Sequence, residues 1–131
     1  LPKQEQFSFV DLGSGCGGLL NNLAKVHKNG LFYGIESAPL PLLISKLRSL
    51  PNHGSCQIFW GSFWEYDLSQ YDVVYAYLSP IPMESLWRKV SKEMRPGSLL
   101  ISNTFLIPGV TPHKSIQLND FSNSTLYLWK I

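Results

Sequence analysis

The sequence FSFVDLGSGCGG occupies residues 7–18 and joins two kinds of local structure. Its first half, Phe7–Leu12, is short, apolar and aromatic, which is typical of a buried parallel strand. Its second half is a glycine cluster, which permits a tight turn and lets a ligand approach the backbone. Apolar residues then recur at helical spacing from Gly17 onward. We therefore predict a strand, a glycine loop and a helix whose N-terminus offers amide donors to an anionic group.

Strands and helices alternate along the chain that follows. The predicted strands are rich in β-branched or aromatic residues, and the predicted helices have apolar residues three and four positions apart. We expect Asn29-Gly30 to end the first helix with a left-handed residue. The predicted strands are 7–12, 31–36, 55–60, 71–78, 98–105, 115–118 and 125–131, and the predicted helices span 17–27, 39–50 and 82–94, with one helical turn within 62–69.

This alternation requires a mostly parallel sheet with right-handed crossovers, and the last two strands follow each other without a helix between them. The fold class that we predict is α/β, a doubly wound, Rossmann-like, mostly parallel sheet that ends in an antiparallel strand pair. With 131 residues, the chain is expected to form a single domain over 1–131.

Composition narrows the functional classes. A hydrophobic fraction of 44% and a charged fraction of 15% indicate a folded globular protein. The net charge of +2 comes from scattered Lys and Arg residues, so the sequence carries no clear nucleic-acid signal. No 18-residue apolar run and no secretory signal is present, so we expect no membrane segment in these 131 residues. The first residue is Leu1, which fits a processed fragment whose upstream part could be a lid helix or an anchor.

Cysteine usage indicates the compartment. Two cysteines, Cys16 and Cys56, in a chain with a substantial core favour a reduced protein, and we expect a cytoplasmic location. His27, His53 and His113 lack the spacing of metal ligands, so we predict no metal site.

Asp11 indicates which ligand the glycine loop receives. Gly13, Gly15 and Gly18 also satisfy the G-x-G-x-x-G pattern of dinucleotide-binding enzymes, so the glycines alone leave a nicotinamide-dependent oxidoreductase as an alternative. A carboxylate two residues before the first glycine would repel a diphosphate and attract an ammonium group. S-adenosylmethionine carries an ammonium and a carboxylate and no phosphate, and it therefore matches Asp11 beside a helix N-terminus. The simpler alternative is that Asp11 only caps the turn.

Glu36 ends the second predicted strand, 25 residues after Asp11. In nucleotide-binding α/β folds, a carboxylate near this place accepts hydrogen bonds from both ribose hydroxyls. A solvated glutamate favoured by the helix dipole is the alternative, since Ser37 begins the predicted second helix.

The ordered set of these motifs resembles the class I S-adenosylmethionine-dependent methyltransferase superfamily over essentially the whole chain. The motifs are Asp11-x-Gly13-x-Gly15-x-Gly17, Glu36, Tyr71-Asp72-Val73-Val74 and Arg95-Pro96-Gly97. Within that superfamily, the stretches YDVVYAYLSP and LWRKVSKEMRPGSLLISNTFLIPG and the terminal LYLW are similar to small protein-lysine methyltransferases. This second similarity implies a protein lysine as a candidate methyl acceptor.

The resemblance assigns roles to individual residues. It implies that Tyr77 faces the transferred methyl group, where an aromatic face attracts the sulfonium, although a half-buried strand tyrosine is the alternative. Tyr77 and Ser79 are the catalytic candidates for assisting deprotonation of an acceptor amine. Phe63 or Trp64 would pack on the adenine, with Ser62 where an aspartate is common. The implied cofactor-binding residues are Asp11, Gly13, Ser14, Gly15, Cys16, Gly17, Glu36, Ser37, Gly61, Ser62, Phe63 and Tyr77.

The leading hypothesis is methyl transfer by in-line displacement, with catalysis mainly by alignment of the reactants. The segment Ala76-Tyr77-Leu78-Ser79-Pro80 lacks the Asn-Pro-Pro-aromatic tetrad of methyltransferases that act on exocyclic amines of DNA or on glutamine, which makes those acceptors less favoured. A further alternative is a non-catalytic module that binds a partner through Trp60, Phe63 and Trp64.

Overall fold

The computed structural model describes residues 6–13, 18–37, 56–118 and 124–131 of the chain. The chain divides into two compact units, unit 1 (Leu1–Tyr66) and unit 2 (Asp67–Ile131), and each is described by itself. The prediction of a single domain over 1–131 stays a prediction.

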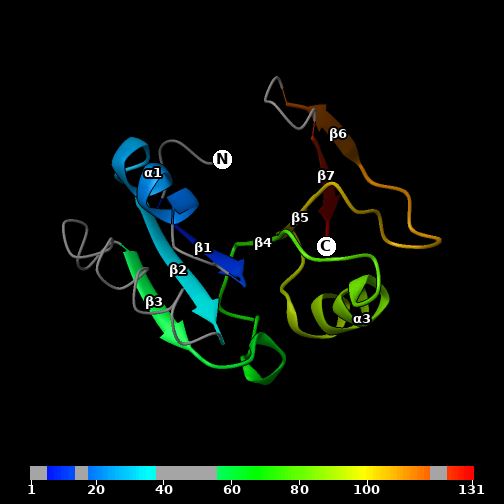
Figure 1. Ribbon diagram of the computed structural model, residues 1–131, viewed down its shortest axis with the longest axis horizontal. Coiled ribbons are helices and arrows are strands. Elements are labelled where there is room, and N and C mark those ends of the chain that lie inside the picture. Colours follow the sequence, from blue (N-terminus) through cyan, green and yellow to red (C-terminus); the bar gives the residue numbers. More distant parts are fainter. Residues whose placement is uncertain (1–5, 14–17, 38–55, 119–123) are drawn as a thin grey trace. The chain divides into compact units, whose positions relative to one another are not determined.

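Unit 1 is a three-stranded parallel sheet with a helix beside it (Figure 1). In chain order its elements are β1 (Phe7–Leu12), α1 (Gly18–Val26), β2 (Gly30–Glu36), β3 (Cys56–Trp60) and the short 3-10 helix η2 (Phe63–Glu65). β2 is the central strand, because it pairs with β1 on one side and with β3 on the other. The carboxyl ends of β1 and β2 therefore lie side by side.

One face of this sheet carries the aromatic core of unit 1. Phe7 and Phe9 of β1 both pack against Phe32 of β2, with ring centroids 5.6 Å apart in each pair. The ring of His27, directly after α1, meets the ring of Phe7 edge-on. Since Leu20 and Ala24 of α1 are also buried, α1 covers this aromatic face.

Gly30 does not have the role that we predicted. Its φ is not positive, and it is the first residue of β2 rather than a left-handed helix end. The packing explains why a glycine stands there. A Cβ added to Gly30 would lie 2.5 Å from Cε2 of Phe32 and 2.9 Å from Cζ of Phe7. The aromatic rings therefore occupy the space that a side chain would need.

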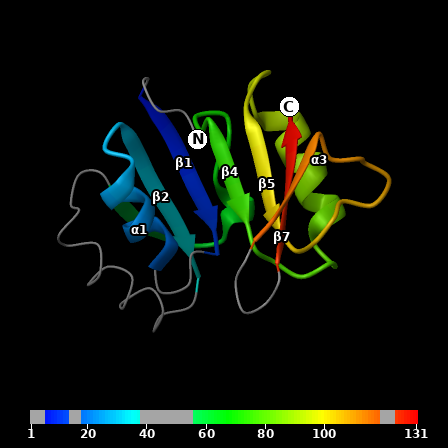
Figure 2. The ribbon, with the colours of Figure 1, turned by 90° about the horizontal axis from the view of Figure 1, so that it is seen from above.

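Unit 2 combines parallel and antiparallel strands (Figure 2). Its elements are β4 (Val73–Ala76), α3 (Met83–Glu93), β5 (Leu99–Asn103), β6 (Lys114–Gln117) and β7 (Thr125–Lys130). β4 and β5 are parallel, β7 is antiparallel to β5, and β6 is antiparallel to β7. This is the predicted change from parallel strands to an antiparallel end pair.

The core of unit 2 contains the residues that the helical pattern predicts. Met83, Leu86 and Val90 of α3 are buried, as expected from their spacing. Trp129 of β7 is fully buried, and its indole nitrogen donates a hydrogen bond to the carbonyl oxygen of Val110, 3.1 Å away. That bond satisfies the indole N–H where water cannot reach it.

The element boundaries agree with the predictions to within two residues. The largest differences are that β5 ends two residues early and that the strand predicted at 71–78 is shortened by two residues at each end to Val73–Ala76. The helix predicted at 39–50 lies outside the described residues. Among the described helices, none has the length and apolar character needed to cross a membrane.

The packing at Gly30 generates a stability prediction. We expect Gly30→Ala to lower the free energy of unfolding by about 1–3 kcal/mol, because the added methyl group overpacks the Phe7 and Phe32 rings. Denaturant unfolding measures this loss. Phe32→Leu removes the nearest ring atoms, so Gly30→Ala should cost less in that background. An equal cost in both backgrounds would show that ring contact is not the reason for the glycine.

Candidate functional site

Two acidic side chains project from one face of the unit 1 sheet at its carboxyl edge. Asp11 pairs with Gly34 across β1 and β2, and Glu36 lies two residues beyond Gly34. Because side chains alternate between the two faces of a strand, Asp11, Gly34 and Glu36 share one face. Gly34 places no side chain between the two acids, and both belong to the face that α1 covers.

The two acids are buried despite their charge. Asp11 is 5% exposed and Glu36 is 9% exposed. Burial, with a smaller contribution from the negative charge of Glu36, raises the pKa of Asp11 from its ordinary value to about 7. Buried carboxylates are costly unless a cation or a set of donors compensates them. The arrangement therefore favours a positively charged ligand at this edge.

Glycines shape the ends of the strands. Gly13 follows β1 with a φ of 72°, in the left-handed region, and its amide donates to the carbonyl oxygen of Ile35, 2.9 Å away. This positive φ agrees with the predicted tight turn. Gly61 follows β3 with a φ of 139°, and its amide donates to the carbonyl oxygen of Glu36, 3.0 Å away. Two predicted cofactor residues, Glu36 and Gly61, are thus in direct contact.

An aromatic group follows β3. Ser62 precedes η2, and its carbonyl oxygen accepts a hydrogen bond from the amide of Glu65. The rings of Phe63 and Trp64 are in contact, with centroids 4.5 Å apart, and neither residue is buried. These are the two aromatic residues predicted to pack against an adenine, and they present apolar ring surface on unit 1.

Trp60, the last residue of β3, and Tyr66, which follows η2, make contacts that the sequence did not predict. The indole nitrogen of Trp60 donates to the carbonyl oxygen of Ser37, 3.3 Å away. The hydroxyl of Tyr66 donates to the carbonyl oxygen of Trp60, 2.8 Å away. The contact of Trp60 with Ser37 links residues 23 positions apart, so it follows from the register of β2 and β3 and leaves no local pattern in the sequence.

Tyr77 and Ser79 belong to unit 2, directly after β4. Tyr77 is 55% exposed, and Ser79 is also exposed. The predicted strand through residue 78 ends instead at Ala76, so Tyr77 is not the half-buried strand tyrosine of the alternative interpretation. Its exposed ring follows the carboxyl end of a parallel strand, where α/β proteins bind their ligands.

Other predicted features have these outcomes. Ser14, Gly15, Cys16 and Gly17 lie outside the described residues. Cys56 is a free, buried thiol. Among the residues that the structure describes, no group of three or more His, Cys, Asp or Glu side chains could hold a metal ion.

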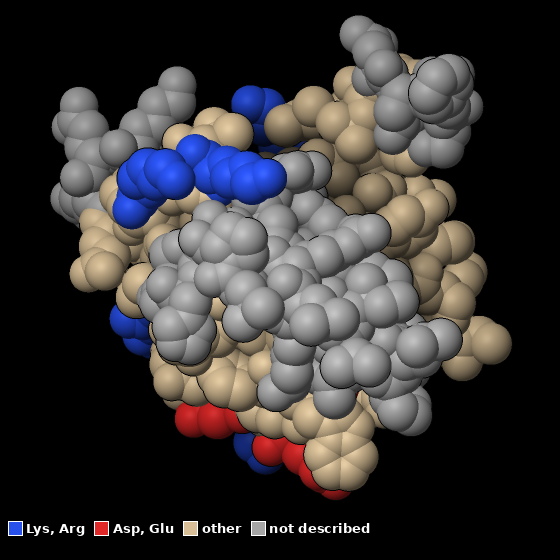
Figure 3. Space-filling view, turned by 60° about the vertical axis from the view of Figure 1, so that its left-hand side comes forward, with Lys and Arg blue, Asp and Glu red and all other residues tan. Residues whose placement is uncertain are grey.

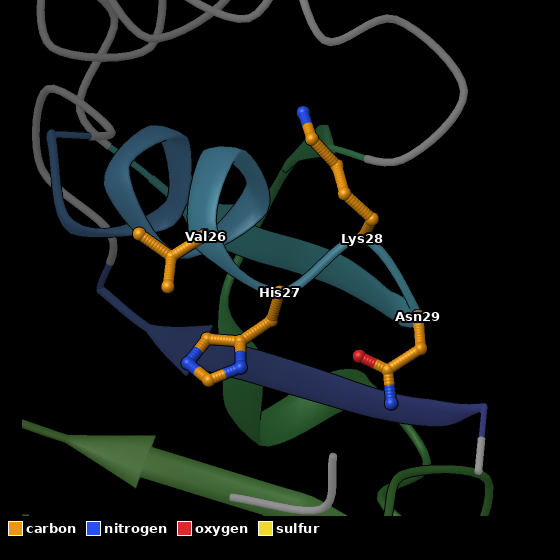
Figure 4. Close-up of a pocket in the computed structure, with 4 residues that line it drawn as sticks. All are labelled: Val26, His27, Lys28 and Asn29. Atoms are coloured by element: carbon orange, nitrogen blue, oxygen red, sulfur yellow. The ribbon is translucent and has the colours of Figure 1, made fainter. Parts of the chain in front are cut away.

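A hollow of about 480 Å³ lies at the opposite edge of unit 1 from the acids. It is lined by Val26, His27, Lys28 and Asn29, between the end of α1 and the start of β2 (Figure 4). The ring of His27 lies over β1, where it contacts Phe7. This position, at the amino end of β2, separates the hollow from the Asp11 and Glu36 edge.

Basic side chains of unit 1 do not form an extended stripe on the face that Figure 3 shows. Lys25 and Lys28 are exposed near the end of α1. Figure 3 shows Lys and Arg side chains at several separate places, and no continuous stripe of them crosses the described residues of that face. This agrees with the scattered charge of the sequence.

Comparison with known proteins identifies the family. Residues 11–114 match the model of the ANTKMT methyltransferase domain. A protein-lysine N-methyltransferase from Saccharolobus islandicus (strain REY15A) is 31% identical over 124 residues, which cover 92% of this chain and 77% of that protein.

Solved structures share the fold. An RNA methyltransferase from Salinibacter ruber, in complex with S-adenosyl-L-homocysteine, matches with a TM-score of 0.82 and 26% identity over 95% of this chain and 80% of its own. The B. subtilis M1A22 tRNA methyltransferase TrmK has a TM-score of 0.78 at 10% identity, over 96% of this chain and 60% of that chain, and so shows the fold alone. These matches confirm the predicted fold class and decide against the nicotinamide-dependent alternative. The chain belongs to the ANTKMT methyltransferase domain family and is an S-adenosylmethionine-dependent methyltransferase.

Proposed function

We propose that this methyltransferase acts on the amino group of protein lysine side chains. The observation that carries this acceptor is the relative named as a protein-lysine N-methyltransferase, which is 31% identical over 92% of the chain. The resemblance of the YDVVYAYLSP and LYLW stretches to small protein-lysine methyltransferases points the same way.

The acidic edge of unit 1 fits the methionine end of the cofactor. Asp11 is buried beside the negative charge of Glu36, and the pKa of about 7 reflects how unfavourable its negative charge is in the free protein. A ligand ammonium group beside Asp11 would compensate that charge and stabilise the ionised carboxylate. We assign Asp11 to the ammonium group, and the loop of Gly13, Ser14, Gly15, Cys16 and Gly17 to the ligand carboxylate.

The nucleoside end is assigned to the ends of β2 and β3. Glu36 accepts hydrogen bonds from the ribose hydroxyls, with Ser37 next to it. Gly61, Ser62 and Phe63 contact the adenine. The support for this assignment is the hydrogen bond from Gly61 to Glu36, which brings the two segments together. Ser62 stands where the superfamily often has an aspartate, so we assign adenine recognition mainly to ring packing by Phe63.

Tyr77 and Ser79 are assigned to the reaction itself. The chemistry that the bound cofactor supplies is an electrophilic methyl group on a sulfonium. The exposed ring of Tyr77 attracts that positive charge, and cation–π attraction of this kind contributes about 0.5–2 kcal/mol. The lysine amine must lose a proton to become a nucleophile. The hydroxyl of Ser79 or Tyr77 would relay that proton to solvent water, and transfer of the methyl group would then release S-adenosylhomocysteine. The remaining catalysis is alignment of amine and methyl group.

The role of Asp11 predicts opposite effects on binding and stability. Asp11→Asn should weaken S-adenosylhomocysteine binding about 10-fold or more, because a charged partner of the ammonium is lost. The same variant should unfold at a higher temperature than wild type at pH 8, because it removes a buried negative charge. Calorimetric titration and thermal unfolding measure the two effects. Weaker binding together with lower stability would contradict the assignment, since it would indicate general damage to the edge.

The pKa of Asp11 also predicts a pH dependence of stability. In the native state Asp11 keeps its proton up to about pH 7, whereas in the unfolded chain it loses it near pH 4. Its contribution to stability is therefore fully present below pH 4, falls as the pH rises from 4 to 7, and is constant above. The free energy of unfolding of wild type and of Asp11→Asn is measured by denaturant unfolding between pH 5 and 8. The difference between the two proteins isolates the pH dependence that Asp11 contributes. A flat difference would contradict the raised pKa.

A labelling experiment tests the acceptor. The protein and tritiated S-adenosylmethionine are added to a lysate whose own methyltransferases have been inactivated by heat. We expect label in protein, recovered after acid hydrolysis as methyllysine. Label recovered from RNA instead would favour the activity named for the Salinibacter ruber structure. No labelled macromolecule at all would contradict the lysine proposal.

The same assay tests Tyr77. Tyr77→Phe keeps the aromatic face and should retain methyl transfer within about threefold, whereas Tyr77→Ala should lose about tenfold, as expected for a cation–π contact. If Tyr77→Phe loses as much as Tyr77→Ala, the hydroxyl acts in proton transfer and the sulfonium contact is not the role of this residue.

A further inference from the structure

Two hydrogen bonds join the end of β3 to the end of β2, and a third closes the segment that follows β3. Gly61 N–H donates to the Glu36 carbonyl at 3.0 Å, and the Trp60 indole N–H donates to the Ser37 carbonyl at 3.3 Å. Tyr66 closes the segment by donating its hydroxyl to the Trp60 carbonyl at 2.8 Å. We call the segment 60–66, with these three bonds, the β3 strap.

Packing holds the strap from the other face of the sheet. The ring of Tyr66 stacks on Phe59, with centroids 6.2 Å apart, and Phe59 stacks in turn on Tyr33 of β2, 5.8 Å away. A Cβ at Gly61 would lie 3.3 Å from the Tyr66 ring, and the φ of Gly61 is 139°. The turn is therefore closed tightly around Tyr66, and a glycine is needed at this point.

The location of Trp60 argues against a role in the core. Trp60 is the register partner of Glu36, so the two side chains share a face. Yet Trp60 is 66% exposed whereas Glu36 is buried. A tryptophan so exposed gains little from burial, and the contact that the structure gives its indole nitrogen is the bond to Ser37.

We propose that the β3 strap, through Trp60 and Tyr66, is a positioning device that fixes the backbone of Glu36 and Ser37 so that the Glu36 carboxylate is preorganised for the ribose hydroxyls. The proposal rests on the ribose role of Glu36 given above. Preorganisation reduces the conformational freedom that the ligand must otherwise remove on binding. Trp60 and Tyr66 are positioning residues, since neither needs to touch the cofactor for this effect.

The test compares two ligands. S-adenosylhomocysteine and its analogue that lacks both ribose hydroxyls are titrated by calorimetry into wild type, Tyr66→Phe, Trp60→Phe and the control Tyr127→Phe. Tyr66→Phe removes one hydroxyl and keeps the ring stack, and Trp60→Phe removes the indole N–H from an exposed site. Tyr127→Phe removes a hydroxyl from β7, which belongs to unit 2, whereas the strap belongs to unit 1. Thermal unfolding of every variant checks that the fold is kept.

We expect each strap variant to weaken S-adenosylhomocysteine binding about fivefold, the usual effect of one hydrogen bond, and to leave the analogue unchanged within twofold. Tyr127→Phe should bind both ligands as wild type does. Equal weakening of both ligands, or no weakening of either, would overturn the strap proposal while leaving the cofactor site intact. If wild type itself binds the two ligands equally, the ribose role of Glu36 fails, and the strap proposal fails with it.

Discussion

Two carboxyl groups buried on one face of a small parallel sheet impose the constraint on which this site depends. Asp11 and Glu36 stand at the ends of adjacent strands, and Gly34, which pairs with Asp11 and lies two residues before Glu36, adds no side chain beside them. The pKa of Asp11 is raised to about 7. Such a pair is unfavourable in the free protein, because each charge is desolvated and each repels the other. A cationic ligand would compensate these charges and so gain binding energy. A diphosphate would add further negative charge, and the same residues therefore disfavour it.

The remainder of unit 1 supports that edge. The aromatic face of Phe7, Phe9 and Phe32 packs beneath α1 and fixes the strands that carry the acids. The β3 strap links the end of β3 to Glu36 and Ser37 by backbone and side-chain hydrogen bonds. Rigid elements thus carry the polar groups, and preorganisation of this kind is what distinguishes a binding site from a chance cluster of charges.

The sequence predicted those features that depend on local pattern. The spacing of apolar residues and the local composition predict β1 and the helix α3 closely. The position of Asp11 between an apolar strand and a glycine turn makes it a candidate cofactor-binding residue. Features that depend on contacts across the sheet could not be predicted in this way. Because Asn-Gly commonly ends a helix, the local pattern predicts a helix end at Gly30, whereas the packing of two aromatic rings decides which residue stands there. The bond from Trp60 to Ser37 needs the register of β2 and β3, which no local motif encodes.

The central claim concerns the charge of one carboxyl group, and NMR titration of the Asp11 side-chain carboxyl carbon measures that charge directly. The spectrum is followed from pH 4 to pH 9, first on the free protein and then with saturating S-adenosylhomocysteine. We predict a pKa near 7 in the free protein, and a pKa lowered by the ligand ammonium in the complex. A pKa that stays the same or rises on binding would contradict the account, because the ammonium would then not lie beside Asp11.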